Sequence, residues 1–291
     1  MNIRRTLLTG GLAGGALTLA ACSPTRVLNA WLPGDTHTLT ADVAYGDDPR
    51  QRLDIYRPRS PAPAGGYPVV LFFYGGSWNT GSRADYRFVG EALAAQGLLA
   101  LVADYRLYPQ VRYPDFLHDC ARALAYALRE APRLTGDARR VFVMGHSAGA
   151  YNAAMLALDE RWLAPLNLSP KQLAGWIGLA GPYDFIPVVN PDVRPVFHHP
   201  NEPPESQPIR YADRPAIRSF LGAARADSLV NPQRNTEQLA QRLQRAGTDV
   251  TLRWYERANH VTLAGAFARP LRWIAPVLDD VEAFVKTTPA L

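Results

Sequence analysis

A serine between two glycines is the first feature of this 291-residue chain that indicates chemistry. Ser147 is the central residue of GHSAG (145–149), which fits the pattern G-x-S-x-G. The motif follows the apolar run RVFVM (140–144), which predicts a strand, and it opens an alanine-rich stretch that predicts a helix. A sharp turn between a strand and a helix exposes the serine hydroxyl, and the small flanking residues let neighbouring backbone approach. The sequence therefore predicts that Ser147 is a nucleophile.

A serine hydroxyl attacks a carbonyl carbon effectively only beside a general base, which is itself oriented by an acid. Three histidines follow Ser147, and two of them, His198 and His199, lie in a proline-rich segment before the predicted acid. His260 lies between the last predicted strand and the last predicted helix. Serine, acid and histidine usually follow one another in this order when the serine motif is present. We therefore expect His260 to be the base.

Two aspartates compete for the role of the acid. Asp227 lies in the loop that directly follows the apolar run IRSFL (217–221). Asp184 lies one predicted strand earlier, in GPYDF (181–185). The order along the chain and the strand position favour Asp227, and Asp184 is the alternative.

Backbone N–H groups are expected to bind the oxyanion that develops when the serine attacks a carbonyl. One is the N–H of Ala148, at the N-terminus of the predicted helix, where the helix adds partial positive charge. Others are expected in YGGSW (74–78), which directly follows a buried strand. We nominate the N–H groups of Gly76 and Ser77, because glycines let the backbone approach a substrate.

The segments around these residues predict the fold that positions them. Continuous apolar runs, typical of strands buried on both faces, alternate with segments whose apolar residues recur every three or four positions. Two short runs open the pattern as an antiparallel pair, and the last strand is expected at an edge. An α/β fold follows, with a mostly parallel sheet covered by helices on both faces. The predicted strands are 38–45, 52–57, 68–74, 98–105, 140–144, 176–180, 217–221 and 250–255, and the predicted helices are 85–96, 114–133, 148–159, 235–246 and 271–286.

One segment, 181–215, breaks this alternation because it holds nine of the 25 prolines. Proline lacks a backbone N–H, so the segment cannot form a regular helix or a central strand. A loop of this length inside a compact domain is usually functional. We expect a short cap over the site.

Composition limits the classes to which the chain can belong. It is 47% hydrophobic and 20% charged, which fits one α/β domain over 38–291 and excludes a disordered chain. The two cysteines exclude a disulfide scaffold. The net charge of +5 is not gathered in a dense basic stripe, so nucleic-acid binding is not expected. The predicted chemistry needs no cofactor and no metal.

The first residues predict an export signal rather than part of the folded domain. Residues 1–22 combine an arginine pair, an apolar stretch and the ending LAAC. This ending resembles the lipobox of bacterial lipoproteins, in which the cysteine, here Cys22, is acylated and becomes the N-terminus. A tether (23–37) would follow, and Ser23 favours the outer membrane. The resemblance implies a domain in the bacterial cell envelope, anchored by lipid and facing the periplasm. The sequence does not distinguish export by the Sec route from export by the Tat route. The alternatives are an uncleaved anchor helix or an apolar start that arose by chance.

Taken together, five motifs resemble the α/β-hydrolase carboxylesterases over residues 38–286. They are YGGSW, ADYRLYPQVRYPDFLHDCARAL, GHSAG, ADSLVNP and ANHV. The nearest resemblance is to small HGG-x-W esterases, which include kynurenine formamidase-like and feruloyl- or acetylxylan-esterase-like enzymes. The resemblance implies the α/β-hydrolase fold and a triad of Ser147, Asp227 and His260. The histidine that precedes the two glycines in that family is Tyr74 here, which must therefore form different hydrogen bonds.

The predicted function is the hydrolysis of carboxylic esters with small or short acyl groups through an acyl-enzyme on Ser147. An amidase, formamidase or peptidase that uses the same triad is the alternative, and a catalytically silent binding protein is a weaker one. The expected partners are a small-molecule ester and, through the lipid anchor, a membrane. Three aromatic residues, Trp78, Tyr151 and Tyr183, are candidates for lining the substrate pocket, although each also suits a core. The oligomeric state stays open.

Overall fold

A computed structural model describes residues 24–30 and 32–291. The predicted export signal, the acylation of Cys22 and the sorting role of Ser23 therefore lie outside the described residues. Among the helices that the structure describes, none has the length and apolar character that crossing a membrane requires.

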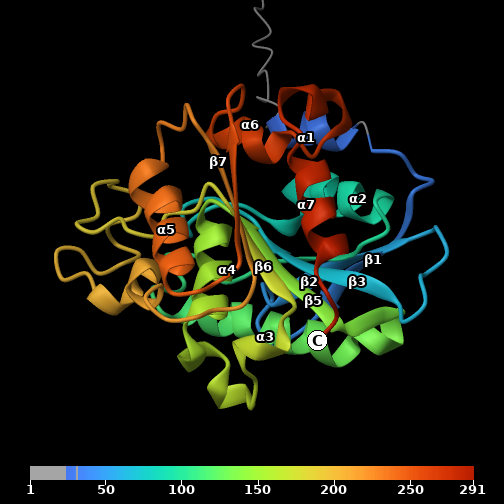
Figure 1. The fold of residues 1–291 in the computed structure, drawn as a ribbon, viewed down its shortest axis with the longest axis horizontal. Coiled ribbons are helices and arrows are strands. Elements are labelled where there is room, and N and C mark those ends of the chain that lie inside the picture. The colour runs from blue at the N-terminus through green and yellow to red at the C-terminus, as the bar shows by residue number, and fades with distance from the viewer. Residues whose placement is uncertain (1–23, 31) are drawn as a thin grey trace, which may run out of the picture.

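An eight-stranded sheet runs through the middle of the molecule in the order β1-β2-β4-β3-β5-β6-β7-β8 (Figure 1). β2 pairs antiparallel with β1 and β4, and the other neighbouring strands are parallel. The mostly parallel sheet, its antiparallel opening pair and the last strand at the edge confirm the predicted fold class. The strands are β1 (His37–Ala44), β2 (Arg52–Pro58), β3 (Tyr67–Phe73), β4 (Leu99–Ala103), β5 (Gly136–His146), β6 (Gly175–Leu179), β7 (Ser219–Ala224) and β8 (Val250–Tyr255).

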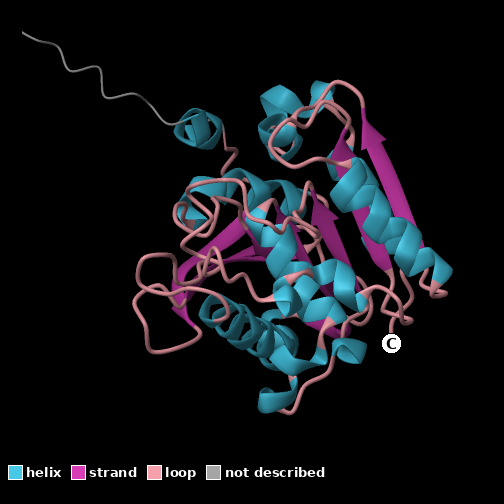
Figure 2. Cartoon of the chain, turned by 90° about the vertical axis from the view of Figure 1, so that its left-hand side faces the viewer, coloured by secondary structure: helices cyan, strands magenta, loops and turns pink. Residues whose placement is uncertain are grey.

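Helices cover both faces of the sheet (Figure 2). The chain passes from β3 to β4 in one direction across the sheet and from β4 onward in the other. Because crossovers between parallel strands are right-handed, this reversal places α2 on the face opposite to α3, α4 and α5. α7 packs against α2. The helices are α1 (Pro24–Ala30), α2 (Arg87–Ala95), α3 (Asp115–Glu130), α4 (Ala148–Leu158), α5 (Gln238–Arg245), α6 (His260–Gly265) and α7 (Val277–Thr287).

The last predicted helix, 271–286, is shorter than expected at its beginning. α7 starts only at Val277, directly after Pro276, and a 3₁₀ helix occupies Arg269–Ile274. Proline inside a helix removes one hydrogen bond and clashes with the preceding turn, so the continuous apolar spacing is divided at Pro276.

The segment expected as a tether contains a helix that packs on the domain. Asn29 of α1 donates hydrogen bonds from Nδ2 to the carbonyls of Ala84 (2.9 Å) and Asp85 (3.2 Å). Its Oδ1 accepts the backbone N–H of Phe88, at 3.1 Å. One side chain thus connects α1 to the first turn of α2 and the 3₁₀ turn before it.

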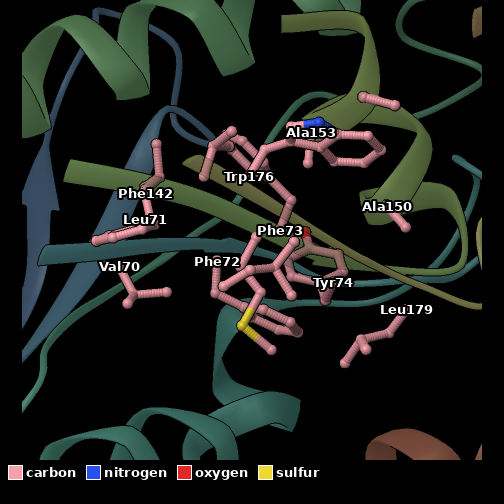
Figure 3. Close-up of a cluster of buried hydrophobic side chains, with 14 of the residues drawn as sticks. Val70, Leu71, Phe72, Phe73, Tyr74, Phe142, Ala150, Ala153, Trp176 and Leu179 are labelled. Carbon is pink, nitrogen blue, oxygen red and sulfur yellow. The ribbon is translucent and has the colours of Figure 1, made fainter. Parts of the chain in front are cut away.

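The core is built around β3 and β5, the central strands. Every residue of β3 is buried, as expected for a strand covered on both faces. Figure 3 shows side chains of β3 together with residues from β5, β6 and α4, among them Phe142, Ala153 and Trp176. This packing fixes the ends of the strands from which the site is built.

The proline-rich segment 181–215 forms no α-helix and no strand, as predicted. Two 3₁₀ turns, Pro204–Ser206 and Pro208–Tyr211, are its regular parts. It is nevertheless well packed, because Val196 and Phe197 are buried completely. The segment is therefore a fixed cover rather than a loose loop.

Candidate active site

Ser147 lies at the sharp turn between β5 and α4. Its backbone has φ 55° and ψ −122°, a conformation that side chains rarely adopt and that costs energy. A Cβ on Gly145 would overlap the carbonyl of Gly149, and a Cβ on Gly149 would overlap the carbonyl of Phe73. The two glycines of the motif are thus required because strand, turn and helix touch here, and the turn presents the Ser147 hydroxyl outward.

The structure brings three of the predicted residues into one hydrogen-bonded relay. Nε2 of His260 lies 2.8 Å from Oγ of Ser147, and Nδ1 of His260 lies 2.7 Å from Oδ2 of Asp227. His260 and Asp227 are only 7% and 8% exposed. The residues come from the carboxyl ends of β5, β7 and β8, which meet at one edge because these strands are parallel.

Asp227 is held as a carboxylate. Burial by itself raises the pKa of Asp227, but hydrogen bonds outweigh it and the pKa is lowered. The side chain of His260 provides one, and the backbone N–H groups of Leu229 and Val230 donate two more to Oδ1, each over 2.9 Å. The other candidate acid, Asp184, forms an ion pair with Arg234 instead (3.1 Å).

The loop after β3 has the backbone geometry of an oxyanion site. Gly76 has φ 139°, and Ser77 and Trp78 have φ 52° and 57°. The carbonyl of Gly76 accepts the N–H groups of Asn79 and Thr80, each at 3.0 Å, which closes the turn. The N–H groups of Gly76 and Ser77 form no hydrogen bond with another described residue. They are available to a ligand, as is expected of oxyanion donors.

Tyr74, which stands where the resembling family has histidine, braces this loop from behind. Its hydroxyl donates to Oδ1 of Asp104 (2.8 Å) and accepts Nη2 of Arg50 (2.7 Å). The ring stacks between those of Tyr86 and Tyr105, with centroids 5.5 and 5.0 Å away. Burial raises the pKa of Tyr74, so the hydroxyl stays protonated and keeps donating.

His146, the residue before the nucleophile, is a member of the site that sequence reasoning missed. It is buried against the ring of His260, with the centroids 5.1 Å apart. Its Nε2 lies 2.8 Å from the backbone carbonyl of His260 and must carry the proton, because a carbonyl only accepts. Burial, then the neighbouring His260, lower the pKa of His146 to about 3. Its place in the motif was the signal that pointed to it.

Two pockets meet at Ser147 and His260. The larger has a volume of about 590 Å³ and extends between α1, α2 and α6. The smaller has a volume of about 180 Å³ and lies under the proline-rich segment, between Trp78, Phe185 and Val193. The segment 181–215 therefore covers the site on one side.

The structure corrects the prediction for two of the three pocket aromatics. Trp78 lines the smaller pocket, and its Nε1 donates to Oδ1 of Asn152 at 3.0 Å. Tyr151 and Tyr183 are buried completely in the core and do not line either pocket. Tyr151 donates its hydroxyl to the carbonyl of Ser206, and Tyr183 packs on Trp176. Aromatic type alone does not distinguish a pocket wall from a core.

Several pocket-lining residues were missed by sequence reasoning. Leu229 lies two residues after the predicted acid and Val261 directly follows the predicted base, and this position was a usable signal. Leu28, Phe88 and Leu271 come from elements far apart in the chain. In the sequence each has the spacing of an ordinary packing residue, so no pattern marked them as pocket residues. Within the described ranges, no group of three or more His, Cys, Asp or Glu is placed to hold a metal ion.

The mostly parallel sheet and the assembled Ser–His–Asp relay define the class of this protein, an α/β-hydrolase. The chain belongs to the BD-FAE family, whose model matches residues 53–243.

Curated relatives share this part of the chain. Esterase LipC of Mycobacterium tuberculosis is 38% identical over 148 residues, which are 49% of this chain and 36% of that protein. A probable isoprenylcysteine alpha-carbonyl methylesterase of Arabidopsis thaliana is 27% identical over 242 residues, 76% of this chain and 50% of that one. A kynurenine formamidase of Danio rerio is 30% identical over 155 residues, 53% of this chain and 50% of the enzyme. The matches span between about a third and a half of the length of these relatives.

Solved structures share the fold. A truncated carbohydrate esterase from gut microbiota superposes with a TM-score of 0.74 at 18% identity, over 88% of this chain and 98% of that one. A hyperthermophilic esterase from the archaeon Pyrobaculum calidifontis gives 0.72 at 19% identity, over 92% and 90%. At this level of identity, the similarity establishes the common architecture alone.

Proposed function

We propose that this chain is a serine hydrolase that cleaves carboxylic esters with short acyl groups through an acyl-enzyme on Ser147. The relay Ser147–His260–Asp227 carries the proposal, with hydrogen bonds of 2.8 and 2.7 Å beside backbone N–H groups that donate to no other described residue. Esterase names among the relatives and the structural neighbours support the same chemistry.

In the first step, Nε2 of His260 takes the hydroxyl proton while Oγ of Ser147 attacks the ester carbonyl carbon. The carbonyl oxygen becomes an oxyanion, which the N–H groups of Gly76, Ser77 and Ala148 stabilise. His260 then donates the proton to the alcohol oxygen as the C–O bond breaks. Asp227 holds the imidazole in the required tautomer throughout and stabilises its charged form.

In the second step, water replaces the alcohol. His260 removes a proton from the water, whose oxygen attacks the acyl carbon, and then returns the proton to Oγ of Ser147. The products are a carboxylic acid and the free enzyme. These steps use no metal and no cofactor.

A short acyl group is proposed because the smaller pocket, of about 180 Å³, is bounded by bulky side chains, Trp78 and Phe185 among them. An amide or formamide substrate is the second candidate, and the kynurenine formamidases among the relatives favour it. The same residues would act on an amide, so only the substrate distinguishes the two.

Hydrolysis of p-nitrophenyl esters with acyl chains from C2 to C12 tests the proposal. We expect turnover to be highest for the short chains and to disappear in Ser147→Ala. Ser60→Ala, on the exposed surface, is the matched control and should keep full activity. If Ser147→Ala hydrolyses every ester as fast as the parent chain, the serine mechanism is wrong. N-formyl and N-acetyl arylamines in the same assay test the amidase alternative.

The proposed location is the bacterial cell envelope, with lipid on Cys22 as the anchor. The ending of residues 1–22 supports it. Metabolic labelling with a radioactive fatty acid should mark the parent chain and not Cys22→Ser, and equal labelling of both would exclude this anchor.

A further inference from the structure

About half of the residues that line the larger pocket, nine of 17, lie in parts of the chain that the family model does not match. Val27 and Leu28 line it from α1, and Val261, Gly265 and Leu271 line it from beyond residue 243. Figure 1 shows α1 and α6 beside each other at the top of the view. Residues outside the matched range therefore contribute to the size and polarity of this pocket.

The wall formed by α1 is fixed in place. The three hydrogen bonds of Asn29 attach it to the start of α2. Glu91 of α2, which is 1% exposed, accepts Thr36 Oγ1 at 3.2 Å, directly before β1. The same carboxylate pairs with Arg269 at 3.3 Å, at the start of the 3₁₀ helix that follows α6. These contacts attach α1 and the segments before β1 and after α6 to the same helix, α2.

The pocket suits a hydrocarbon group. Leu28, Phe88, Val261 and Leu271 form its walls, and none of its described lining residues is Asp, Glu, Lys or Arg. A hydroxyl-rich or charged group placed here would lose hydrogen bonds to water that these walls do not replace. A volume of about 590 Å³ is within the range of pockets that enclose ligands of moderate size.

The direction in which each pocket leaves the base indicates which half of an ester it receives. Nε2 of His260 must reach the oxygen of the departing alcohol in order to protonate it. α6 begins at His260, and its following residues line the larger pocket. Ser77, Ser147 and His260 line both pockets, and Gly76 lines the larger one, so the pockets differ in the direction in which they leave the site. The smaller pocket extends past Ala148, the first residue of α4, under the proline-rich segment.

We propose that the larger pocket is the alcohol subsite, and that the substrates of this enzyme are short-chain acyl esters of hydrophobic alcohols. α1 is a specificity-determining wall of this subsite. The inference deepens the proposed function and rests on it, because an alcohol subsite has meaning only if the chain hydrolyses esters.

Two isomeric esters test the orientation in the full-length chain. Octyl acetate and methyl nonanoate contain the same atoms, but the hydrocarbon chain is on the alcohol in the first and on the acyl group in the second. We expect kcat/KM to be at least about tenfold higher for octyl acetate, which is the range that a few methylenes in an apolar pocket provide. Equal values, or a preference for methyl nonanoate, would overturn the proposal. Absence of any hydrolysis that depends on Ser147 would instead contradict the proposed function.

Variants of α1 test its part in the subsite. Leu28→Ala removes a wall side chain, and Asn29→Ala removes the attachment of the helix. In both, the ratio of kcat/KM for octyl acetate to that for ethyl acetate should fall about tenfold. Leu166→Ala, at a surface leucine that lines neither pocket, should leave the ratio unchanged. An unchanged ratio in both folded α1 variants would exclude α1 from the subsite.

Discussion

The Nε2–H of His146 donates a hydrogen bond to the backbone carbonyl of His260 over 2.8 Å. The residue before the nucleophile therefore holds the backbone of the residue that we propose as the base. In neutral His146 the proton is on Nε2, and Nδ1 carries none. Nδ1 is buried with no hydrogen-bond partner among the described residues. Burial, and then the neighbouring His260, disfavour the protonated form of His146, which explains the low pKa.

His146 should make the folded protein sensitive to acid. Its pKa falls from 6.5 to about 3 on folding, so between these values the unfolded chain binds a proton that the folded chain does not. The free energy of unfolding therefore decreases as the pH falls from 6.5 towards 3, by up to about 1.4 kcal/mol per pH unit. In His146→Gln, the loss of stability between pH 7.5 and pH 5 should be smaller by about 2 kcal/mol in urea denaturation.

The control for this experiment is His118→Gln, because His118 is exposed on α3. It should lose as much stability between pH 7.5 and pH 5 as the parent chain. An equal loss in His146→Gln and in the parent chain would show that His146 is not the group that titrates.

Asp227→Asn should lower kcat for ester hydrolysis by about 10⁴-fold, because an amide in this position favours the wrong tautomer of His260. Asp184→Asn should change kcat by only a few-fold, because the carboxylate of Asp184 pairs with Arg234 and does not contact His260. Steady-state kinetics on a p-nitrophenyl ester distinguish the two. A greater loss of kcat in Asp184→Asn than in Asp227→Asn would show that Asp184 is the acid of the triad.

Tyr74→Phe should lower the free energy of unfolding. The variant removes a donor from the buried carboxylate of Asp104 and an acceptor from Arg50, which costs about 1–3 kcal/mol. Urea denaturation at neutral pH measures it. The matched control is Tyr126→Phe, whose hydroxyl forms no hydrogen bond with another described residue, and it should stay within about 0.5 kcal/mol of the parent.

Gly76→Ala should lower kcat by about 10²–10³-fold, the loss typical of one missing oxyanion donor. With φ at 139° and the carbonyl of Thr80 where a Cβ would lie, alanine forces the loop to move its N–H groups. Gly34→Ala has open space around it and should keep full activity. Full activity in a folded Gly76→Ala protein would remove this loop from the mechanism.

The sequence by itself determined where the strands lie along the chain and which residue types form the candidate site. The spacing of apolar runs predicted all eight strands, because strands buried on both faces require continuous apolar residues. GHSAG predicted the turn at Ser147, because its glycines are needed where strand and helix touch. The position of His260 after the last strand placed it at the same sheet edge as Ser147.

Tertiary structure alone decided what surrounds these residues. Chain order favoured Asp227 but left Asp184 as an alternative, and the 2.7 Å contact with His260 shows which of the two lies beside the histidine. Tyr151 is an aromatic residue of the kind that often lines pockets, but it lies in the core. Its burial depends on which elements pack over it. The large pocket joins Leu28, Phe88 and Leu271, which are far apart in the chain. No local pattern encodes such a wall, since its shape arises only when α1, α2 and the segment after α6 pack together.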